Sequence, residues 1–259
     1  MLDPIAIRPA RFFPRPHDNR PNTIDAEFRG LTMEHTNKKY GQELSDLRSG
    51  LIRMGSIVTD QIDGALERFA AHDDTGARGI IERDAEVNRM DIELEEACLR
   101  LLALHQPAAI DLRLITAAMK ITTELERIGD RVVNICEAIA DSGTSDPASN
   151  EVLRIGKLAG AMVRDAMEAF SGNDASLVKP VLEKDKEFDR LYSHLFPNLL
   201  TSLAKDPERI ARDAKLALLA KDLNEISEHA TNIAEVVMFL VNGKEITHMD
   251  MHERRALTV

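Results

Sequence analysis

Two stretches of the sequence resemble each other closely enough to decide the fold. The first reads LERIGDRVVNICE (125–137) and the second reads LNEISEHATNIAE (223–235). In both, apolar residues recur every three or four positions, which is the spacing of one buried face of an α-helix. Because the pattern returns in a second half of the chain, we predict that the protein contains a duplicated helical unit.

The duplication extends beyond these two stretches. IERDAEVNRM (81–90) matches LEKDKEFDRL (182–191), and Pro107 has its counterpart in Pro207. Apolar residues follow a helical period through both units, which predicts three helices in each. The predicted helices cover residues 42–72, 74–104, 108–141, 149–171, 174–204 and 207–242. Each unit, at about 100 residues, is long enough to bury a core of its own.

Polar turn residues separate the predicted helices. Asp73 and Asp74 are suitable N-cap residues for the second helix, and GND (172–174) supplies a break and a cap before the fifth. Asp206 followed by Pro207 is a strong signal for the start of the sixth, because proline is tolerated at the first helical position.

The ends of the chain differ from these units. Residues 1–32 hold five of the ten prolines and show no helical or strand period, so we expect a disordered extension, either a start-site artefact before Met33 or a short interaction arm. Residues 142–149 are the linker-like stretch between the units. The expected organisation is an extension over 1–33, a first three-helix bundle over 34–142, a second over 148–245 and a tail over 246–259.

The composition favours an all-α protein and excludes several functions. Aromatic residues make up 4% of the chain, whereas strand-rich domains favour aromatic and β-branched residues. A net charge of −11 disfavours binding to nucleic acid or to an anionic membrane surface. The apolar run at 236–241 is far shorter than a membrane span, so we expect no membrane insertion. Cys98 and Cys136 lie within helical patterns, which favours reduced thiols and a cytoplasmic location.

A stripe of carboxylates and amides lies opposite the apolar face of the third helix. Its members, spaced by four, four and three residues, are Glu126, Asp130, Asn134 and Glu137. Similar polar positions in the second, fifth and sixth helices are Asp84, Asn88, Asp185, Asp189, Asn224, Glu228, Asn232 and Glu235. A solvated helix face explains such a stripe. The alternative is a site for a hard cation, because clustered oxygen ligands without cysteine suit magnesium, manganese or iron.

These residues resemble the PhoU family, which regulates bacterial phosphate uptake. The resemblance rests on residues 126–137 and 229–235 and covers 34–245. It implies two antiparallel three-helix bundles related by pseudo-twofold symmetry, frequent homodimers and no catalytic activity. It also implies a cytoplasmic negative regulator that links the phosphate ABC transporter, through its ATPase PstB, to the sensor kinase PhoR.

The resemblance further implies metal binding through acid-x-x-x-Asp motifs, with iron, zinc, manganese or magnesium as the metal. In this chain the motif falls on Glu126 and Asp130, with Asp84 facing them. In the second half Asn224 replaces the first acid and Glu228 replaces the aspartate, so we expect weaker binding there because an amide brings no charge. The predicted metal ligands are Asp84, Glu126, Asp130, Asn134, Glu137, Asp185, Asp189, Asn224, Glu228 and Glu235.

Other functions stay open at this stage. A metal-binding or metal-buffering bundle, or an accessory of a low-affinity phosphate transporter, fits the same helices. An exposed His229 beside Glu228 could mark a phosphotransfer module, although a single helical histidine is common. His248 and His252 form an i, i+4 pair near the chain end. Glycine-rich phosphate loops and nucleophile elbows are absent, so no catalytic residue is predicted.

Overall fold

The computed structural model describes residues 38–139, 147–205 and 209–243. The predicted terminal segments 1–33 and 246–259, together with His248 and His252, lie outside these ranges. So do most of the predicted linker and the predicted helix start at Asp206 and Pro207.

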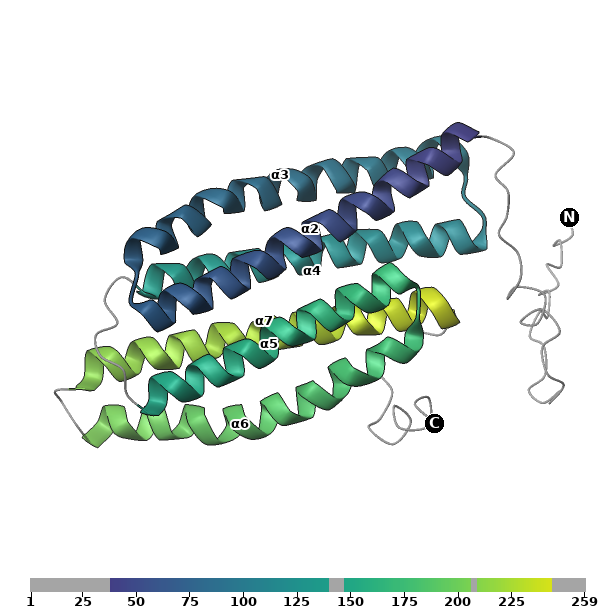
Figure 1. The fold of residues 1–259 in the computed structure, drawn as a ribbon. Coiled ribbons are helices and arrows are strands. Elements are labelled where there is room, and N and C mark those ends of the chain that lie inside the picture. Colours follow the sequence, from purple (N-terminus) through teal and green to yellow (C-terminus); the bar gives the residue numbers. More distant parts are fainter. Residues whose placement is uncertain (1–37, 140–146, 206–208, 244–259) are drawn as a thin grey trace, which may run out of the picture. The chain divides into compact units, whose positions relative to one another are not determined.

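Six long α-helices make up the described part of the chain (Figure 1). Within those residues no strand occurs, so the all-α prediction is confirmed. The helices are α2 (Lys38–Ala71), α3 (Asp74–His105), α4 (Ala109–Ile139), α5 (Pro147–Gly172), α6 (Val178–Lys205) and α7 (Ile210–Asn242), with a 3₁₀ turn, η1 (Ala175–Leu177), before α6.

Two of the predicted caps form as the sequence indicates. An Asp73 oxygen accepts a hydrogen bond from the backbone N–H of Gly76 at 3.0 Å and caps α3. Asp174 accepts from the backbone N–H of Ser176 at 2.8 Å, but it caps η1 rather than α6 directly. Helix α7 begins at Ile210, later than predicted, and its N-cap residue Arg209 makes no side-chain capping bond.

Each half of the chain folds into a three-helix bundle. Helices α2, α3 and α4 pack against one another, and α5, α6 and α7 do the same (Figure 1). The predicted apolar stripes point inward; Leu51, Met54 and Val58 of α2, for example, have no exposed surface. The prediction of two tandem three-helix bundles is therefore confirmed.

The two bundles share one continuous apolar core through the pairs α2/α5 and α4/α7. Glycines allow α2 and α5 to approach closely. A Cβ atom at Gly160 would lie 3.1 Å from Ile62 of α2, and one at Gly156 would overlap Leu66. Arg164 of α5 then reaches α2, where its Nη1 bonds both carboxylate oxygens of Asp63 at 2.9 and 2.8 Å. Helices α2–α7 are consequently one compact unit.

Candidate functional site

A buried carboxylate marks the outer side of the α3/α4 pair. Asp84 of α3 is 7% exposed, and its Oδ2 accepts a hydrogen bond from Asn88 at 3.0 Å. Its Oδ1 is buried and has no hydrogen-bond partner among the described residues. Gly129 of α4 leaves room for this oxygen, because a Cβ there would come within 2.9 Å of it. A buried carboxylate oxygen without a partner is costly, and a bound cation would remove that cost.

Further acids of α3 and α4 extend from Asp84, and the pKa values of Asp84, Asp91 and Glu126 are raised. Burial, and then the charge of Asp130, raise the pKa of Asp84, while the bond from Asn88 opposes the shift. Burial raises the pKa of Asp91, and the charge of Glu95 adds to it. For Glu126, burial and the charges of Asp130, Asp91 and Asp84 raise the pKa, against a smaller effect of Arg127. Mutually repelling carboxylates of this kind favour the binding of a positive charge.

We call these five side chains, Asp84, Asp91, Glu95, Glu126 and Asp130, the α3/α4 acid cluster. Of the five ligands predicted for the first half, Asp84, Glu126 and Asp130 lie close enough for their charges to interact, and Asp91 and Glu95 were not among the predicted ligands. Within the described ranges, no group of three or more histidine, cysteine, aspartate or glutamate side chains is already arranged around a metal position. Metal binding here would therefore require the carboxylates to turn toward a shared ion.

The predicted ligands of the second half lie on α6 and α7. Asp185 of α6 accepts a hydrogen bond from Thr231 at 3.3 Å. Asn224 donates to Glu228 at 2.7 Å within α7, and Asp189 is exposed on α6. Glu235 lines a groove between α4 and α7. Asp185, Asn224 and Glu235 thus have different neighbours in the described part of the second half, and the weaker metal site there stays a prediction.

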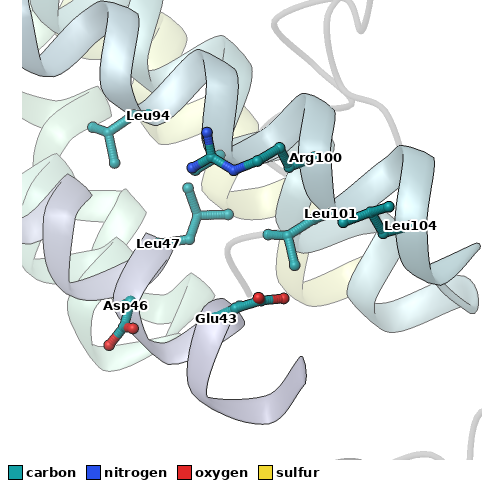
Figure 2. A pocket seen from close by; sticks show the side chains of 8 residues that line it. Glu43, Asp46, Leu47, Leu94, Arg100, Leu101 and Leu104 are labelled. Atoms are coloured by element: carbon teal, nitrogen blue, oxygen red, sulfur yellow. The ribbon is translucent and has the colours of Figure 1, made fainter. Parts of the chain in front are cut away.

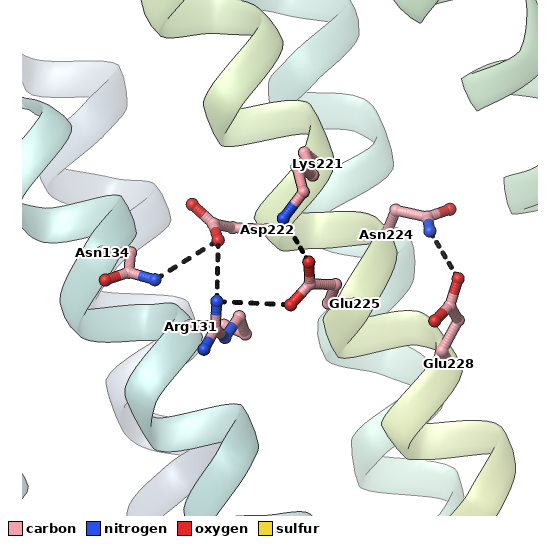
Figure 3. A network of polar contacts seen from close by, with 7 residues as sticks. All are labelled: Arg131, Asn134, Lys221, Asp222, Asn224, Glu225 and Glu228. Atoms are coloured by element: carbon pink, nitrogen blue, oxygen red, sulfur yellow. Dashed lines mark hydrogen bonds and ion pairs between the residues drawn. The ribbon is translucent and has the colours of Figure 1, made fainter.

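Asn134, another predicted ligand, instead joins the two bundles (Figure 3). Its Nδ2 donates to Asp222 of α7 at 3.4 Å, and Arg131 contacts Asp222 at 3.6 Å and Glu225 at 3.3 Å. Burial raises the pKa of Asp222, while Asn134 and Arg131 oppose the shift. Lys221 also forms an ion pair with Glu225. Arg131 and Lys221 therefore already pair with Asp222 and Glu225, two acids that could otherwise have served as metal ligands in the second half. Glu137 lies farther along α4, exposed.

The arrangement formed by the acid Asp222, the amide Asn134 and the base Arg131 occurs a second time between α4 and α7. A carboxylate oxygen of Glu124 in α4 is hydrogen-bonded to Asn232 Nδ2 at 3.1 Å and to His229 Nδ1 at 2.6 Å. In the alignment of 125–137 with 223–235, Glu124 corresponds to Asp222, and Arg131 and Asn134 correspond to His229 and Asn232. The duplication therefore produces two equivalent polar contacts that hold the bundles together.

His229 is consequently not the exposed residue that the sequence analysis expected. Its side chain is 15% exposed, and its ring is held by Glu124 from the other bundle. The expectation was wrong because the partner comes from a helix in the other half of the chain. Burial raises the pKa of Glu124, but the bonds and charges of His229, Asn232 and Arg127 outweigh it and leave that pKa lowered.

A groove lies between α2 and α3 (Figure 2). Its volume is about 240 Å³. Glu43 and Asp46 of α2 and Arg100 of α3 border a floor of leucine side chains, and Leu104 stands beside it with 71% of its surface exposed. Its lining residues are Glu43, Asp46, Leu47, Leu94, Ala97, Arg100, Leu101 and Leu104.

Fold and surface together define the class of protein: a duplicated three-helix bundle with an acid cluster on its first repeat. Among the described helices, none has the length and apolar character needed to cross a membrane. The PhoU domain matches residues 51–139 and 152–237, one match in each repeat. The chain therefore belongs to the PhoU family.

Relatives and solved structures agree with this assignment. The chain is 36% identical over 225 residues to the phosphate-specific transport system accessory protein PhoU homolog of Pseudomonas putida, covering 86% of this chain and 88% of that one. The Caulobacter vibrioides homolog of the same name is 36% identical, with 83% and 94% covered. The fold matches the crystal structure of PhoU from Pseudomonas aeruginosa with a TM-score of 0.76 at 36% identity, covering 79% and 100% of the two chains.

The phosphate transport system regulatory protein PhoU from Streptococcus pneumoniae also matches. Its TM-score is 0.72 at 28% identity, and the match covers 80% of this chain and 98% of that one. At the level of the family, these names identify accessory and regulatory proteins of phosphate transport.

Proposed function

We propose that this protein is a negative regulator of the phosphate-starvation response and a modulator of high-affinity phosphate uptake. The family match in both repeats is the observation that carries this proposal. In the proposed mechanism the protein acts in the cytoplasm as an adaptor between the transporter ATPase PstB and the sensor kinase PhoR. It has no catalytic activity of its own in this mechanism, and it works as a homodimer that presents helix faces to its partners.

Deletion of the gene tests the regulatory role. With phosphate in excess, we expect starvation reporters in the deletion strain to be expressed as strongly as in starved wild-type cells, because the signal of phosphate sufficiency no longer reaches the kinase. Reporter expression and phosphate uptake are measured together, and a plasmid copy of the gene should restore repression. Normal reporters with altered metal content would instead favour the alternative of a metal-buffering bundle. Normal reporters with altered low-affinity uptake would favour an accessory of a different transporter.

We further propose that the acid cluster binds a divalent or ferric ion, with iron, zinc, manganese and magnesium as candidates. Asp84, Glu126 and Asp130 would hold the ion, and the partnerless oxygen of Asp84 supports this choice. Among the second-half candidates, Asn224 and Glu228 bond each other, which supports a weaker site there. A bound cation would relieve the repulsion within the cluster and shape the charge of this face.

Elemental analysis of protein purified without chelator tests the metal site. We expect Glu126→Ala/Asp130→Ala to lose most of the bound metal, because two of the three proposed ligands are removed. The matched control is Glu93→Ala/Glu96→Ala, which removes two acids of α3 that pair with arginines and are 65% exposed. Equal metal content in the wild type and the first variant would rule out this assignment.

A further inference from the structure

Two exposed apolar side chains stand on the outer face of α3. Ile92 is 58% exposed and Leu99 is 51% exposed. Seven residues apart on one helix, they lie on the same side and about 10 Å from each other along its axis. They lie away from the apolar stripe of α3 that includes Val87, Leu94 and Cys98 and is buried in the core. Core packing therefore does not explain their presence.

This apolar pair borders the acid cluster. Asp91 precedes Ile92, and Glu95 lies between Ile92 and Leu99, one helical turn from each. The acids extend from there across to Glu126 of α4, whose charge interacts with that of Asp91. One continuous surface of α3 and α4 thus combines apolar side chains with closely spaced negative charge.

Two arginines of α3 pair with acids outside the cluster. Arg89 pairs with Glu93 at 3.6 Å, and Arg100 pairs with Glu96 at 3.6 Å. By helical periodicity all four lie toward the other side of α3 from Asp84 and Asp91. Arg127 of α4 offsets part of the charge around Glu126, whereas the charge that acts on Asp91 is that of Glu95. The negative charge of Asp91 and Glu95 is accordingly available to a partner, and charge complementarity at an interface steers association and fixes register.

We propose that the α3 face formed by Ile92, Leu99, Asp91 and Glu95 docks a basic amphipathic helix of a protein partner. Apolar residues of the partner helix, at helical spacing, cover Ile92 and Leu99, and lysine or arginine residues along one edge contact Asp91 and Glu95. The inference deepens the proposed adaptor role and rests on it, since an adaptor needs a surface of this kind.

Binding of a test peptide to the full chain measures this docking. The probe is a helical peptide of about 14 residues made of leucine and lysine in an amphipathic pattern, and its counterpart carries glutamate in place of lysine. Fluorescence anisotropy should show the lysine peptide binding at least roughly tenfold more tightly than the glutamate peptide. Ile92→Ser/Leu99→Ser and Asp91→Asn/Glu95→Gln should each weaken it by roughly tenfold, and the second should also reduce the salt dependence.

Matched variants separate this surface from the general acidity of the protein. Leu200→Ser/Leu218→Ser removes two leucines that are 47% and 58% exposed elsewhere, and Glu168→Gln/Glu183→Gln removes the same charge from α5 and α6. Both should bind as the wild type does. Equal losses in test and control variants, or equal binding of the two peptides, would overturn the proposal. The result is independent of the deletion test, which measures signalling in cells, so the two proposals can fail separately.

Discussion

Replacement of Gly156 by leucine is expected to destabilise the protein by about 3 kcal/mol. Gly156 lies where α5 crosses α2, and even a Cβ atom there would overlap Leu66 and come within 3.4 Å of Leu223 of α7. Leu66 and Leu223 are both buried, so neither can move into solvent to make room. The larger side chain would have to push the two bundles apart. Urea denaturation followed by far-UV circular dichroism gives the free energy of unfolding.

The control is a second helical glycine with open space around it. A Cβ atom at Gly79 of α3 would meet nothing within 4 Å, so Gly79→Ala should stabilise the protein by about 0.5–1 kcal/mol through the better helix propensity of alanine. The two substitutions thus have opposite expected signs. If Gly156→Leu unfolds at the wild-type urea concentration, close packing of α2 on α5 does not hold the bundles together.

The helices themselves were predictable because burial leaves a local periodic pattern in the sequence. Leu125, Ile128 and Val132 follow that period, and all three have no exposed surface. The comparison of the two halves also marked Asp84, Glu126 and Asp130 as polar positions with a polar counterpart in the other repeat, and the resemblance to the family placed Asp84 opposite the other two. Neither inference needed knowledge of how the bundles contact each other.

The missed residues depend on contacts between distant parts of the chain. Asp91 and Glu95 join the acid cluster, but their counterparts in the second repeat are Tyr192 and Phe196, so a search for matched polar positions passes over them. Asn134 lies in the predicted stripe, yet it bonds Asp222 of the other bundle. The helical period of a sequence predicts on which side of its helix a residue lies. It does not predict which other helix that residue contacts.

Arg131→Ala is expected to destabilise the protein by about 2 kcal/mol at pH 7. Asp222 is 9% exposed, and the substitution removes its charged partner while leaving the carboxylate buried. Loss of one member of a fully buried ion pair costs about 3–5 kcal/mol, and the expected value is lower because Arg131 is itself 28% exposed. By contrast, Arg154→Ala breaks an exposed pair with Glu187 and should change stability by less than about 0.5 kcal/mol.

The pH dependence of this loss tests whether Arg131 acts on a carboxylate, and an Asp222→Asn background separates Asp222 from Glu225, the other acid that Arg131 contacts. Burial holds the folded-state pKa of Asp222 above its unfolded value, and without Arg131 that pKa rises further. A raised folded-state pKa gives stability that is complete below the unfolded pKa and is lost as the pH rises through the folded pKa. The destabilisation by Arg131→Ala should therefore grow as the pH rises from 4 to 7, because the buried carboxyl without its partner is then ionised in a larger fraction of the folded variant. In an Asp222→Asn background the same substitution should cost at least about 1 kcal/mol less. An equal cost in both backgrounds would assign the effect to Glu225 instead of Asp222, and a cost that does not change between these pH values would show that Arg131 acts through packing instead of through its charge.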